Sequence, residues 1–391
     1  VAHDIRSPLT ALNVAISSID KLAEDKRILI RNAIQRINDI ANDLLTKGKM
    51  VQDNIPPNSF TSSTFDNELA STVMLSSLVD MLVSEKRTQY RDQIGIQIGA
   101  DLSQSYGLFA KLPANELKRV LSNLVNNSVE AFDNGQGKIF IQIKEENDWI
   151  KIEVIDNGKG IPSGIIEKLG LEIVSFGKEG TSSGSGLGIQ HATKFVSSLG
   201  GKIEFLSHPQ TSAGTTVSLY IPKCQPPIWF VNRIEIPENS RVIALDDDQS
   251  IHSVWQGRLL SLKASEHGIK LTGFTSADIF RSWILSQTDL THNILFLIDY
   301  ELLGQKIIGL DIIEELGLHK NSILVSSRYD EKNVYERCKR LGIRIIPKAM
   351  AGLVPIEVSK TKTVLDAVLI DDDPLVHMTW NVSAKENQKA I

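Results

Sequence analysis

Apolar residues along the first 50 positions recur at alternating steps of three and four, which is the spacing of a coiled-coil seam. A break at residues 23–25 divides the pattern into two runs, so the pattern predicts a helical hairpin. A hairpin with one apolar seam on each arm lacks a complete core. We therefore expect residues 1–50 to form an all-α dimerisation hairpin that becomes a four-helix bundle in the dimer. The two seams consist of Ala2, Ile5, Leu9, Leu12, Ile16 and Ile19, and of Ile30, Ile34, Ile37, Ala41 and Leu44.

Helical and alternating strand patterns segregate between residues 65 and 222, after a linker at 52–63 that contains Pro56 and Pro57. Strands and helices segregated in this way predict a mixed sheet with helices over one face, an α+β sandwich. The expected helices are 72–91, 116–132 and 190–198, and the expected strands are 94–98, 138–144, 149–155, 202–205 and 215–221.

A second pattern begins after residue 240, where short and wholly apolar strands alternate with helices over residues 241–358. Such strands are typical of a parallel, doubly wound α/β sheet. Residues 223–240 join the two domains as a proline-containing linker. Residues 228–231 in this linker are too apolar for a free tether, so we expect them to pack on a domain or to form an extra strand. The four expected strands are 242–245, 294–298, 323–325 and 343–346.

Composition and charge exclude some classes of function and agree with the domain organisation predicted above. The 391 residues predict roughly two to four domains, and the net charge of −5 gives no basic footprint for nucleic acid. The two cysteines, Cys224 and Cys338, form neither a disulfide framework nor a zinc spacing, which suits a reducing cytosol. No apolar run approaches the roughly 20 residues that span a bilayer. Because the chain opens on Val1, close before His3, we expect a fragment whose input region lies upstream.

His3 is the candidate nucleophile of the hairpin. It lies one position off the first seam, on a flank that stays exposed when the seam is buried, and Asp4 follows it. A carboxylate beside an imidazole can fix its tautomer and accept its proton, which leaves the other nitrogen free to attack phosphorus. The alternative is a solvated surface histidine.

Two polar motifs in residues 65–222 suit a nucleotide. Asn123 and Asn127 share one face of a predicted helix, where an amide oxygen can ligate Mg²⁺; the alternative is a pair of solvated or capping asparagines. Asp156 ends a predicted strand and precedes Gly158 and Gly160. Its carboxylate can accept a hydrogen bond from an exocyclic amine such as that of adenine, and the glycines let backbone approach the ligand. Taken alone, this second motif is equally compatible with a turn.

A glycine-rich segment supplies a third motif. Gly184, Gly186 and Gly188 precede the helix expected at 190–198, and glycines that open a helix present unpaired N–H groups to phosphate. A lone glycine loop is a weak signal. Three such motifs in this order, behind a histidine hairpin, are a strong one.

Polar residues also follow the apolar strands of residues 241–358. In a parallel sheet the carboxyl ends of the strands meet at one edge and form the site. Asp246 and Asp247 are expected to bind Mg²⁺, Asp299 to accept a phosphoryl group as an acyl phosphate, and Ser326 and Lys348 to stabilise the phosphoryl oxygens.

Together these motifs resemble those of the hybrid sensor histidine kinases of two-component signalling. Residues 3–9 look like the H box, residues 123–127 the N box, residues 156–160 the G1 box and residues 184–188 the G2 box. The resemblance covers residues 1–222 and implies that residues 65–222 have the GHKL or histidine kinase ATPase fold, with ATP and Mg²⁺ as cofactors.

The same resemblance implies roles for individual residues. His3 is then the phosphoacceptor, Asp4 its base, Asn127 a Mg²⁺ ligand and Asp156 the adenine reader. The implied nucleotide site also includes Asn123, Gly158, Gly160, Lys178, Gly184, Gly186, Leu187, Gly188 and Thr215.

Residues 241–358 resemble a flavodoxin-like receiver domain, and residues 364–391 resemble the truncated start of a second receiver. The chain departs from the family in three places. Glu130 replaces a basic residue that many relatives carry, Ser7 replaces the usual Thr or Asn of phosphatase-active kinases, and Ile345 replaces an aromatic switch residue. We also expect the helix that follows Lys348 to be short.

The predicted function is an ATP-dependent protein histidine kinase that phosphorylates His3 and passes the phosphoryl group to Asp299. The resemblance implies a homodimer in the bacterial cytoplasm, a histidine phosphotransfer protein or response regulator downstream, and membrane attachment only through an upstream region. The alternatives are a non-catalytic scaffold of the pseudokinase kind, a phosphatase-biased regulator, and an ATPase of the chaperone or mismatch-repair type.

Overall fold

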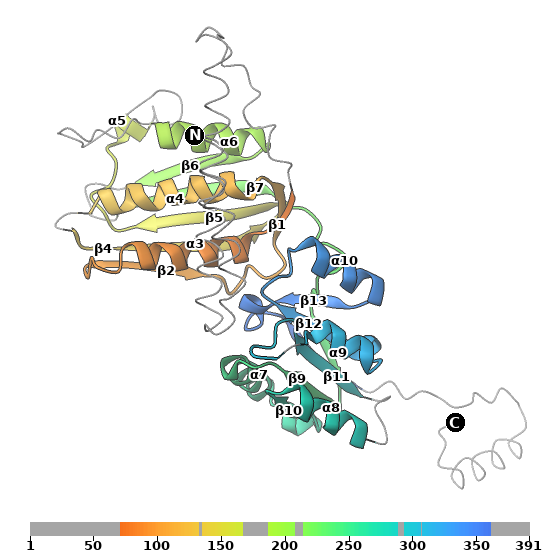
Figure 1. The fold of residues 1–391 in the computed structure, drawn as a ribbon. Helices are drawn as coiled ribbons and strands as arrows, with labels where there is room; N and C mark the ends of the chain where they lie inside the picture. Colours follow the sequence, from red (N-terminus) through yellow and green to blue (C-terminus); the bar gives the residue numbers. More distant parts are fainter. Residues whose placement is uncertain are drawn as a thin grey trace, which may run out of the picture.

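The computed structural model describes residues 71–132, 135–166, 187–207, 214–287, 293–305 and 307–360. The predicted hairpin with His3 and Asp4, and the predicted second receiver start at 364–391, lie outside the described residues. The described chain builds two units, the first around one mixed sheet and the second around one parallel sheet (Figure 1).

The first unit contains a five-stranded sheet in the order β2-β4-β5-β7-β6, and its helices α3, α4 and α6 lie side by side over one face (Figure 1). Only β2 and β4 pair in parallel, and the other neighbours pair antiparallel. Its elements are β1 (Ser71–Met74), α3 (Leu75–Gln89), β2 (Ile96–Asp101), β3 (Phe109–Leu112), α4 (Ala114–Glu130), β4 (Gly137–Glu146), β5 (Trp149–Asp156), α5 (Ser163–Ile166), α6 (Leu187–Ser198), β6 (Lys202–Ser207) and β7 (Thr215–Pro222).

Side-chain periodicity explains how this unit packs. On α4 the apolar residues Leu117, Leu121 and Leu124 recur at helical spacing and are buried against the sheet. On β5 the alternation of a strand turns Ile152 into the core and Glu153 to the opposite face. Burial raises the pKa of the Glu153 carboxyl, but hydrogen bonds from Lys151, Lys144 and Gln142 outweigh it and lower the pKa to about 2.

The sequence pattern missed two short strands in this unit. Residues 71–74, expected as strand-free chain and the start of a helix at 72–91, form β1, which pairs antiparallel with β3. Four-residue strands of this kind are stabilised by their pairing, here from Ser71 opposite Leu112 to Met74 opposite Phe109. Their own sequence period is too short to predict them.

The second unit is a parallel sheet in the order β10-β9-β11-β12-β13. Counted within the unit this order is 2-1-3-4-5, which is that of flavodoxin-like doubly wound folds. Its elements are β8 (Ile234–Pro237), β9 (Arg241–Leu245), α7 (Gln249–Ser261), β10 (Lys270–Phe274), α8 (Ala277–Ser286), β11 (Ile294–Asp299), α9 (Gly309–Glu315), β12 (Ser322–Ser326), α10 (Lys332–Leu341), β13 (Arg344–Pro347) and β14 (Ile356–Ser359), with short 3₁₀ turns at Ala264–His267, His319–Asn321 and Lys348–Met350.

Both faces of this sheet are covered. Ile243 and Leu245 face α8, α9 and α10, whereas Val242 and Ala244 face α7. Because both faces of the sheet are buried, successive residues of each strand are all apolar. The strands therefore appear in the sequence as continuous apolar runs.

The chain on either side of this sheet differs from the expected linker and final helix. Within the predicted linker, β8 pairs in parallel with β14. Where a short final helix was expected, Lys348–Met350 forms a single 3₁₀ turn and the chain then enters β14. Ile234 and Ile356 from this strand pair pack on the α7 side of the core, so the pair covers apolar surface there.

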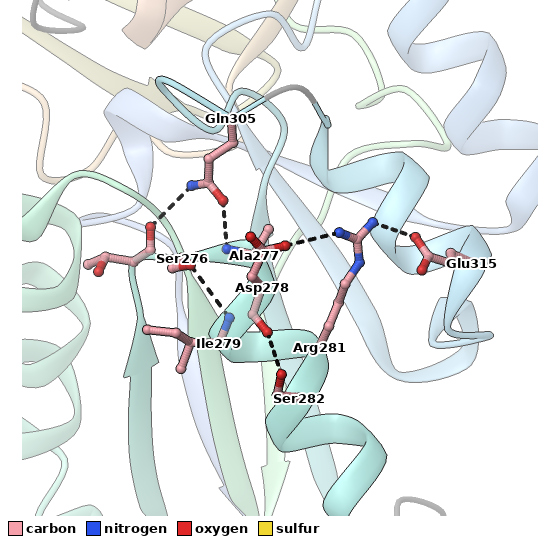
Figure 2. A network of polar contacts seen from close by, with 9 residues as sticks. Ser276, Ala277, Asp278, Ile279, Arg281, Ser282, Gln305 and Glu315 are labelled. Atoms are coloured by element: carbon pink, nitrogen blue, oxygen red, sulfur yellow. Dashed lines mark hydrogen bonds and ion pairs between the residues drawn. The ribbon is translucent and has the colours of Figure 1, made fainter.

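Polar contacts brace the loops at the edge of the second sheet (Figure 2). The Gln305 amide accepts a hydrogen bond from the Ala277 backbone N–H at 2.6 Å and donates one to the Thr275 carbonyl at 3.2 Å. Arg281 on α8 donates to Glu315 at the end of α9 at 2.5 Å (Figure 2). These contacts hold the loop after β11 against the start of α8.

Among the described helices, none is long and apolar enough to cross a membrane.

Candidate functional site

The first unit holds a buried carboxylate at the end of β5. Asp156 is only 6% exposed, and its Oδ1 accepts hydrogen bonds from the backbone N–H groups of Gly158 at 2.9 Å and Thr215 at 3.2 Å. Its Oδ2 accepts a hydrogen bond from the Ser128 hydroxyl of α4 at 2.9 Å. Three donors from three segments therefore fix the orientation of this carboxylate.

Glycines allow the backbone to pack closely around Asp156. A Cβ on Gly158 would lie 2.9 Å from Ala131, and one on Gly214 would lie 1.8 Å from the Asp156 carbonyl oxygen. Gly214 and Gly160 both have a φ of +74°, which side chains rarely adopt. The chain can therefore turn tightly on both sides of the carboxylate only because these residues are glycines.

Adjacent asparagines on α4 have different roles. The Asn126 Oδ1 accepts hydrogen bonds from the Lys86 ammonium at 2.6 Å and the Tyr90 hydroxyl at 3.0 Å, so this amide ties α4 to α3. Asn127 is exposed, on the same helix face as Asn123. A Cβ on Gly188, in the first turn of α6, would lie 3.7 Å from the Asn123 side chain. The structure thus brings the predicted N box and the start of α6 together.

These residues fit an adenine nucleotide. A fixed carboxylate can accept a hydrogen bond from an exocyclic N–H, and the Asn123 amide lies beside the start of the neighbouring helix. Leu187 is the first residue of α6. The predicted site residues Lys178, Gly184 and Gly186 lie outside the described residues.

The second unit gathers the predicted acidic residues at the carboxyl ends of β9 and β11. One carboxylate oxygen from each of Asp246, Asp247 and Asp299 lies within 4.8 Å of the others. The Lys348 ammonium, which follows β13, donates to Asp299 Oδ2 at 2.6 Å and to Asp246 Oδ1 at 3.0 Å. Asp246, Asp299 and Lys348 are all buried. The parallel sheet explains this convergence, because its strand ends meet at one edge.

This cluster fits a divalent cation. One ammonium offsets only part of the charge of three carboxylates, and Asp247 Oδ1 is buried with no hydrogen-bond partner among the described residues. Hard divalent cations such as Mg²⁺ prefer oxygen ligands of this kind. Ser326, at the end of the adjoining strand β12, is 1% exposed, and its Oγ accepts a hydrogen bond from the Arg328 N–H at 3.0 Å.

Sequence reasoning missed two supporting residues. Ser128, which bonds Asp156, carried no signal in the sequence because its contact depends on how α4 packs against β5. His252 lies on α7, and its Nε2 lies 2.8 Å from the Asp246 carbonyl oxygen, so Nε2 is the donor. A Cβ on Gly273 would lie 2.6 Å from His252 Nδ1, so the imidazole fits only because β10 has a glycine there.

A repeated sequence pattern could have identified His252. Three aspartates, then a histidine and a tryptophan at fixed spacing, occur at residues 246–255 and again at residues 371–380. In the first copy the histidine holds the backbone of the acidic segment and Trp255 is 2% exposed in the core. The pattern therefore links the histidine to the acidic cluster.

Comparisons with known proteins concern the part of the chain that contains the first of these sites. Residues 113–225 match the family of histidine kinase-, DNA gyrase B-, and HSP90-like ATPases. The chain is 27% identical to sporulation kinase B of Bacillus subtilis across 57% of this chain and 48% of that kinase. It is 38% identical to a probable C4-dicarboxylate sensor kinase of Halalkalibacterium halodurans across 28% of this chain and 20% of that protein. The solved catalytic domain of histidine kinase ThkA shares 25% sequence identity across 39% of this chain and 95% of its own, with a TM-score of 0.33.

The family match runs from the start of α4 to just beyond β7 and includes Asn123, Asn127 and Asp156. It supports the predicted ATPase fold of this part of the chain and implies the use of ATP. The relatives that the chain matches include proteins named as sporulation kinases and an adaptive-response sensory kinase. The chain spans less than half the length of the curated relatives it matches first, 48% of sporulation kinase B and 40% of sporulation kinase D.

Asp156→Asn tests the nucleotide site. We expect the affinity for ATP to fall roughly tenfold or more, because the substitution removes the charge and turns one acceptor into a donor. Titration with a fluorescent ATP analogue measures it, and Asp148→Asn, in the exposed turn between β4 and β5, is the matched control. Unchanged affinity in Asp156→Asn would place the nucleotide elsewhere.

His252→Leu tests the support of the acidic cluster. We expect Mg²⁺ to bind roughly tenfold more weakly in the absence of nucleotide, because loss of a residue that orients metal ligands typically has this effect. His252→Gln, whose amide can still donate, should recover most of the affinity. His267→Gln, at an exposed ion pair with Glu238, is the control in the same calorimetric titration. If His252→Leu binds Mg²⁺ as tightly as the native chain, the imidazole does not position the cluster.

Proposed function

We propose that the chain is the catalytic part of a hybrid histidine kinase, which phosphorylates His3 from ATP and then transfers the phosphoryl group to Asp299. The observation that carries the proposal is that one chain joins an ATPase-family domain to a buried cluster of three carboxylates and one lysine at the end of a parallel sheet. The first can supply a phosphoryl group, and the second has the groups needed to receive it.

In the nucleotide domain, the Asp156 carboxylate accepts a hydrogen bond from the exocyclic N–H of adenine. The Ser128 hydroxyl holds this carboxylate in place. Asn127, with Asn123 beside it, would hold Mg²⁺ through its amide oxygen, and the segment from Gly184 to Gly188 would bind the phosphates through its N–H groups. Lys178, Leu187, Gly158, Gly160 and Thr215 complete the nucleotide site. ATP supplies the phosphoryl group and, when bound, is oriented by these residues.

His3 then acts as the nucleophile. One imidazole nitrogen forms a bond to the γ-phosphorus, the bond between that phosphorus and the oxygen of the leaving ADP breaks, and Asp4 accepts the proton from the other nitrogen. The step is balanced without a further reactant. Because the hairpin seams need partners, we propose that it occurs in a homodimer.

Asp299 receives the group in the second step. Its carboxylate oxygen forms a bond to phosphorus while the bond to His3 breaks. Asp246, Asp247 and Asp299 would hold a Mg²⁺ ion, which would offset negative charge at this site. Lys348 already contacts Asp299 at 2.6 Å, so it can follow the negative charge from the carboxylate to the phosphoryl oxygens. The hydroxyl of Ser326, on the adjoining strand, donates a hydrogen bond to the same oxygens.

We also propose where the kinase acts and which partner receives its phosphoryl group. The kinase acts in the bacterial cytoplasm, passes its phosphoryl group to a histidine phosphotransfer protein or response regulator, and has no direct contact with nucleic acid. Residues 241–358 act as its receiver, and residues 364–391 begin a second one.

A labelling experiment with γ-labelled ATP and Mg²⁺ tests this function on the native chain, His3→Gln and Asp299→Ala. We expect no label in His3→Gln, because the first acceptor is missing. In Asp299→Ala we expect label to accumulate in an acid-labile, base-stable form, because the histidine cannot pass it on. The chemical stability of the label distinguishes a phosphohistidine from an acyl phosphate.

Two results would contradict the proposal in different ways. If ATP binds and no variant is labelled, the result favours a non-catalytic scaffold. Glu130, which stands where many relatives have a basic residue, agrees with that alternative. If ATP is hydrolysed without any protein label, the chain is an ATPase of another kind.

A further inference from the structure

A cluster of aromatic side chains joins the two units of the structure. Tyr106 and Phe109 come from the nucleotide domain, Trp229 and Phe230 from the predicted linker, and Tyr329 from the receiver side. The ring centroids of Phe230 lie 4.9 Å from those of both Tyr106 and Phe109, and the Trp229 ring lies 5.9 Å from that of Tyr329. We call these five residues the aromatic junction. Aromatic pairs at such distances stabilise beyond the burial of their area.

The backbone of the linker is bound to both units. The Trp229 carbonyl accepts a hydrogen bond from the Ile345 N–H at 2.7 Å, and the Val231 N–H donates to the Ile345 carbonyl at 3.1 Å. The linker therefore runs as an extra strand segment beside β13, and the Tyr106 hydroxyl donates to the Val231 carbonyl at 2.6 Å. Because the linker is held by both units, it does not act as a free tether. A displacement of one unit at this point therefore displaces the other.

The receiver contributes to the junction from the two loops that carry its phosphate-stabilising groups. Tyr329 follows Ser326 by three positions, and Met350 follows Lys348 by two. Met350 is 1% exposed and packs with Phe109, Phe230 and Met74. Each of these loops thus has a polar group at the Asp299 pocket and an apolar group at the nucleotide domain.

The loop after β12 is coupled rigidly to the pocket. The Arg328 N–H donates to Ser326 Oγ, and the Arg328 guanidinium ion-pairs with Glu301, two positions after Asp299, at 3.1 Å. A shift of Ser326 towards a phosphoryl group on Asp299 therefore moves Arg328, and Tyr329 is its next neighbour in the chain.

On the other side, Tyr329 packs on Trp229, and the Trp229 ring lies 6.4 Å from that of Phe109. Phe109 packs in turn with Met74, the residue that precedes α3. Lys86, in the last turn of α3, donates to Asn126 at 2.6 Å, and Asn126 precedes the predicted Mg²⁺ ligand Asn127. Contacts therefore lead from the Asp299 cluster through Tyr329, Trp229 and Phe109 to Met74, and α3 continues from there to the N box. Such a network can couple two sites when both bias the same element.

We infer that the aromatic junction makes nucleotide binding sensitive to the state of Asp299. This inference rests on the proposed function of Asp299 as a phosphoryl acceptor. A phosphoryl group on Asp299 draws Ser326 inward and shifts Tyr329 against Trp229. The shift passes through Phe109 and Met74 to α3, loosens the brace from Lys86 to Asn126 and weakens ATP binding. By linkage, a bound nucleotide disfavours phosphorylation of Asp299 to the same degree. The receiver thus limits a new round of phosphorylation while its own group remains in place.

The test uses the whole chain, with beryllofluoride and Mg²⁺ standing in for the phosphoryl group on Asp299. Binding of beryllofluoride is followed by its ¹⁹F resonance, and nucleotide affinity by titration with a fluorescent, non-hydrolysable ATP analogue. We expect beryllofluoride to lower the nucleotide affinity of the native chain by about fivefold or more, within the usual range of coupling between sites.

Two matched tyrosine variants locate the coupling. Tyr329→Leu, which keeps the loop apolar, should bind beryllofluoride and show no change in nucleotide affinity on binding it. Tyr335→Leu, at a partly buried tyrosine of α10 in the receiver core, should keep the native fold-change. Tyr329→Phe, which keeps the ring, should also keep it.

The outcomes separate this inference from the proposed function. If the native chain binds beryllofluoride and its nucleotide affinity does not change, the inference is overturned and Asp299 remains the proposed acceptor. A native fold-change that persists in full in Tyr329→Leu overturns the route through the junction. If the native chain does not bind beryllofluoride at all, the proposed role of Asp299 falls, and the inference falls with it.

Discussion

Buried carboxylates impose the main constraint on this structure, because an uncompensated charge in a protein interior is costly. Asp156 is 6% exposed, and Asp246 and Asp299 are each 2% exposed. The two units compensate these charges differently. Backbone and hydroxyl donors surround Asp156, whereas the Lys348 ammonium bridges Asp246 and Asp299. The first arrangement leaves a fixed acceptor for a polar ligand, and the second leaves an excess of negative charge that suits a cation.

Much of the architecture was predictable because side-chain periodicity reports burial. The buried face of α4, with Leu117, Leu121 and Leu124 at helical spacing, and the wholly apolar strand β11 both have a direct sequence signature. The acidic cluster was predictable for a topological reason, since parallel strands bring their carboxyl ends to one edge. Elements defined by their partners were not predictable. β1 exists because β3 lies beside it, and β10 is a half-exposed strand containing Gly273.

The same distinction applies to the candidate sites. Asp156 and Lys348 are conspicuous in the sequence because they end apolar strands. Ser128 and His252 are not, because their contacts depend on how a helix packs against a strand from another part of the chain. For the same reason the sequence indicated that residues 228–231 pack on a domain without showing which one. In the structure Trp229 and Phe230 pack between two units, and α3 extends from that contact to the N box. The helix is therefore both part of the nucleotide-domain core and a connection between the sites.

We propose that one phosphoryl group is transferred to two residues of the chain in order, and a pulse–chase experiment can follow this transfer. The native chain is labelled briefly with γ-labelled ATP and then chased with excess unlabelled ATP, and the label is divided into base-stable and hydroxylamine-sensitive fractions over time. If the group passes from His3 to Asp299, the base-stable fraction appears first and decays at the rate at which the hydroxylamine-sensitive fraction rises. If the hydroxylamine-sensitive label appears without a base-stable precursor, or never appears, the relay from His3 to Asp299 is contradicted.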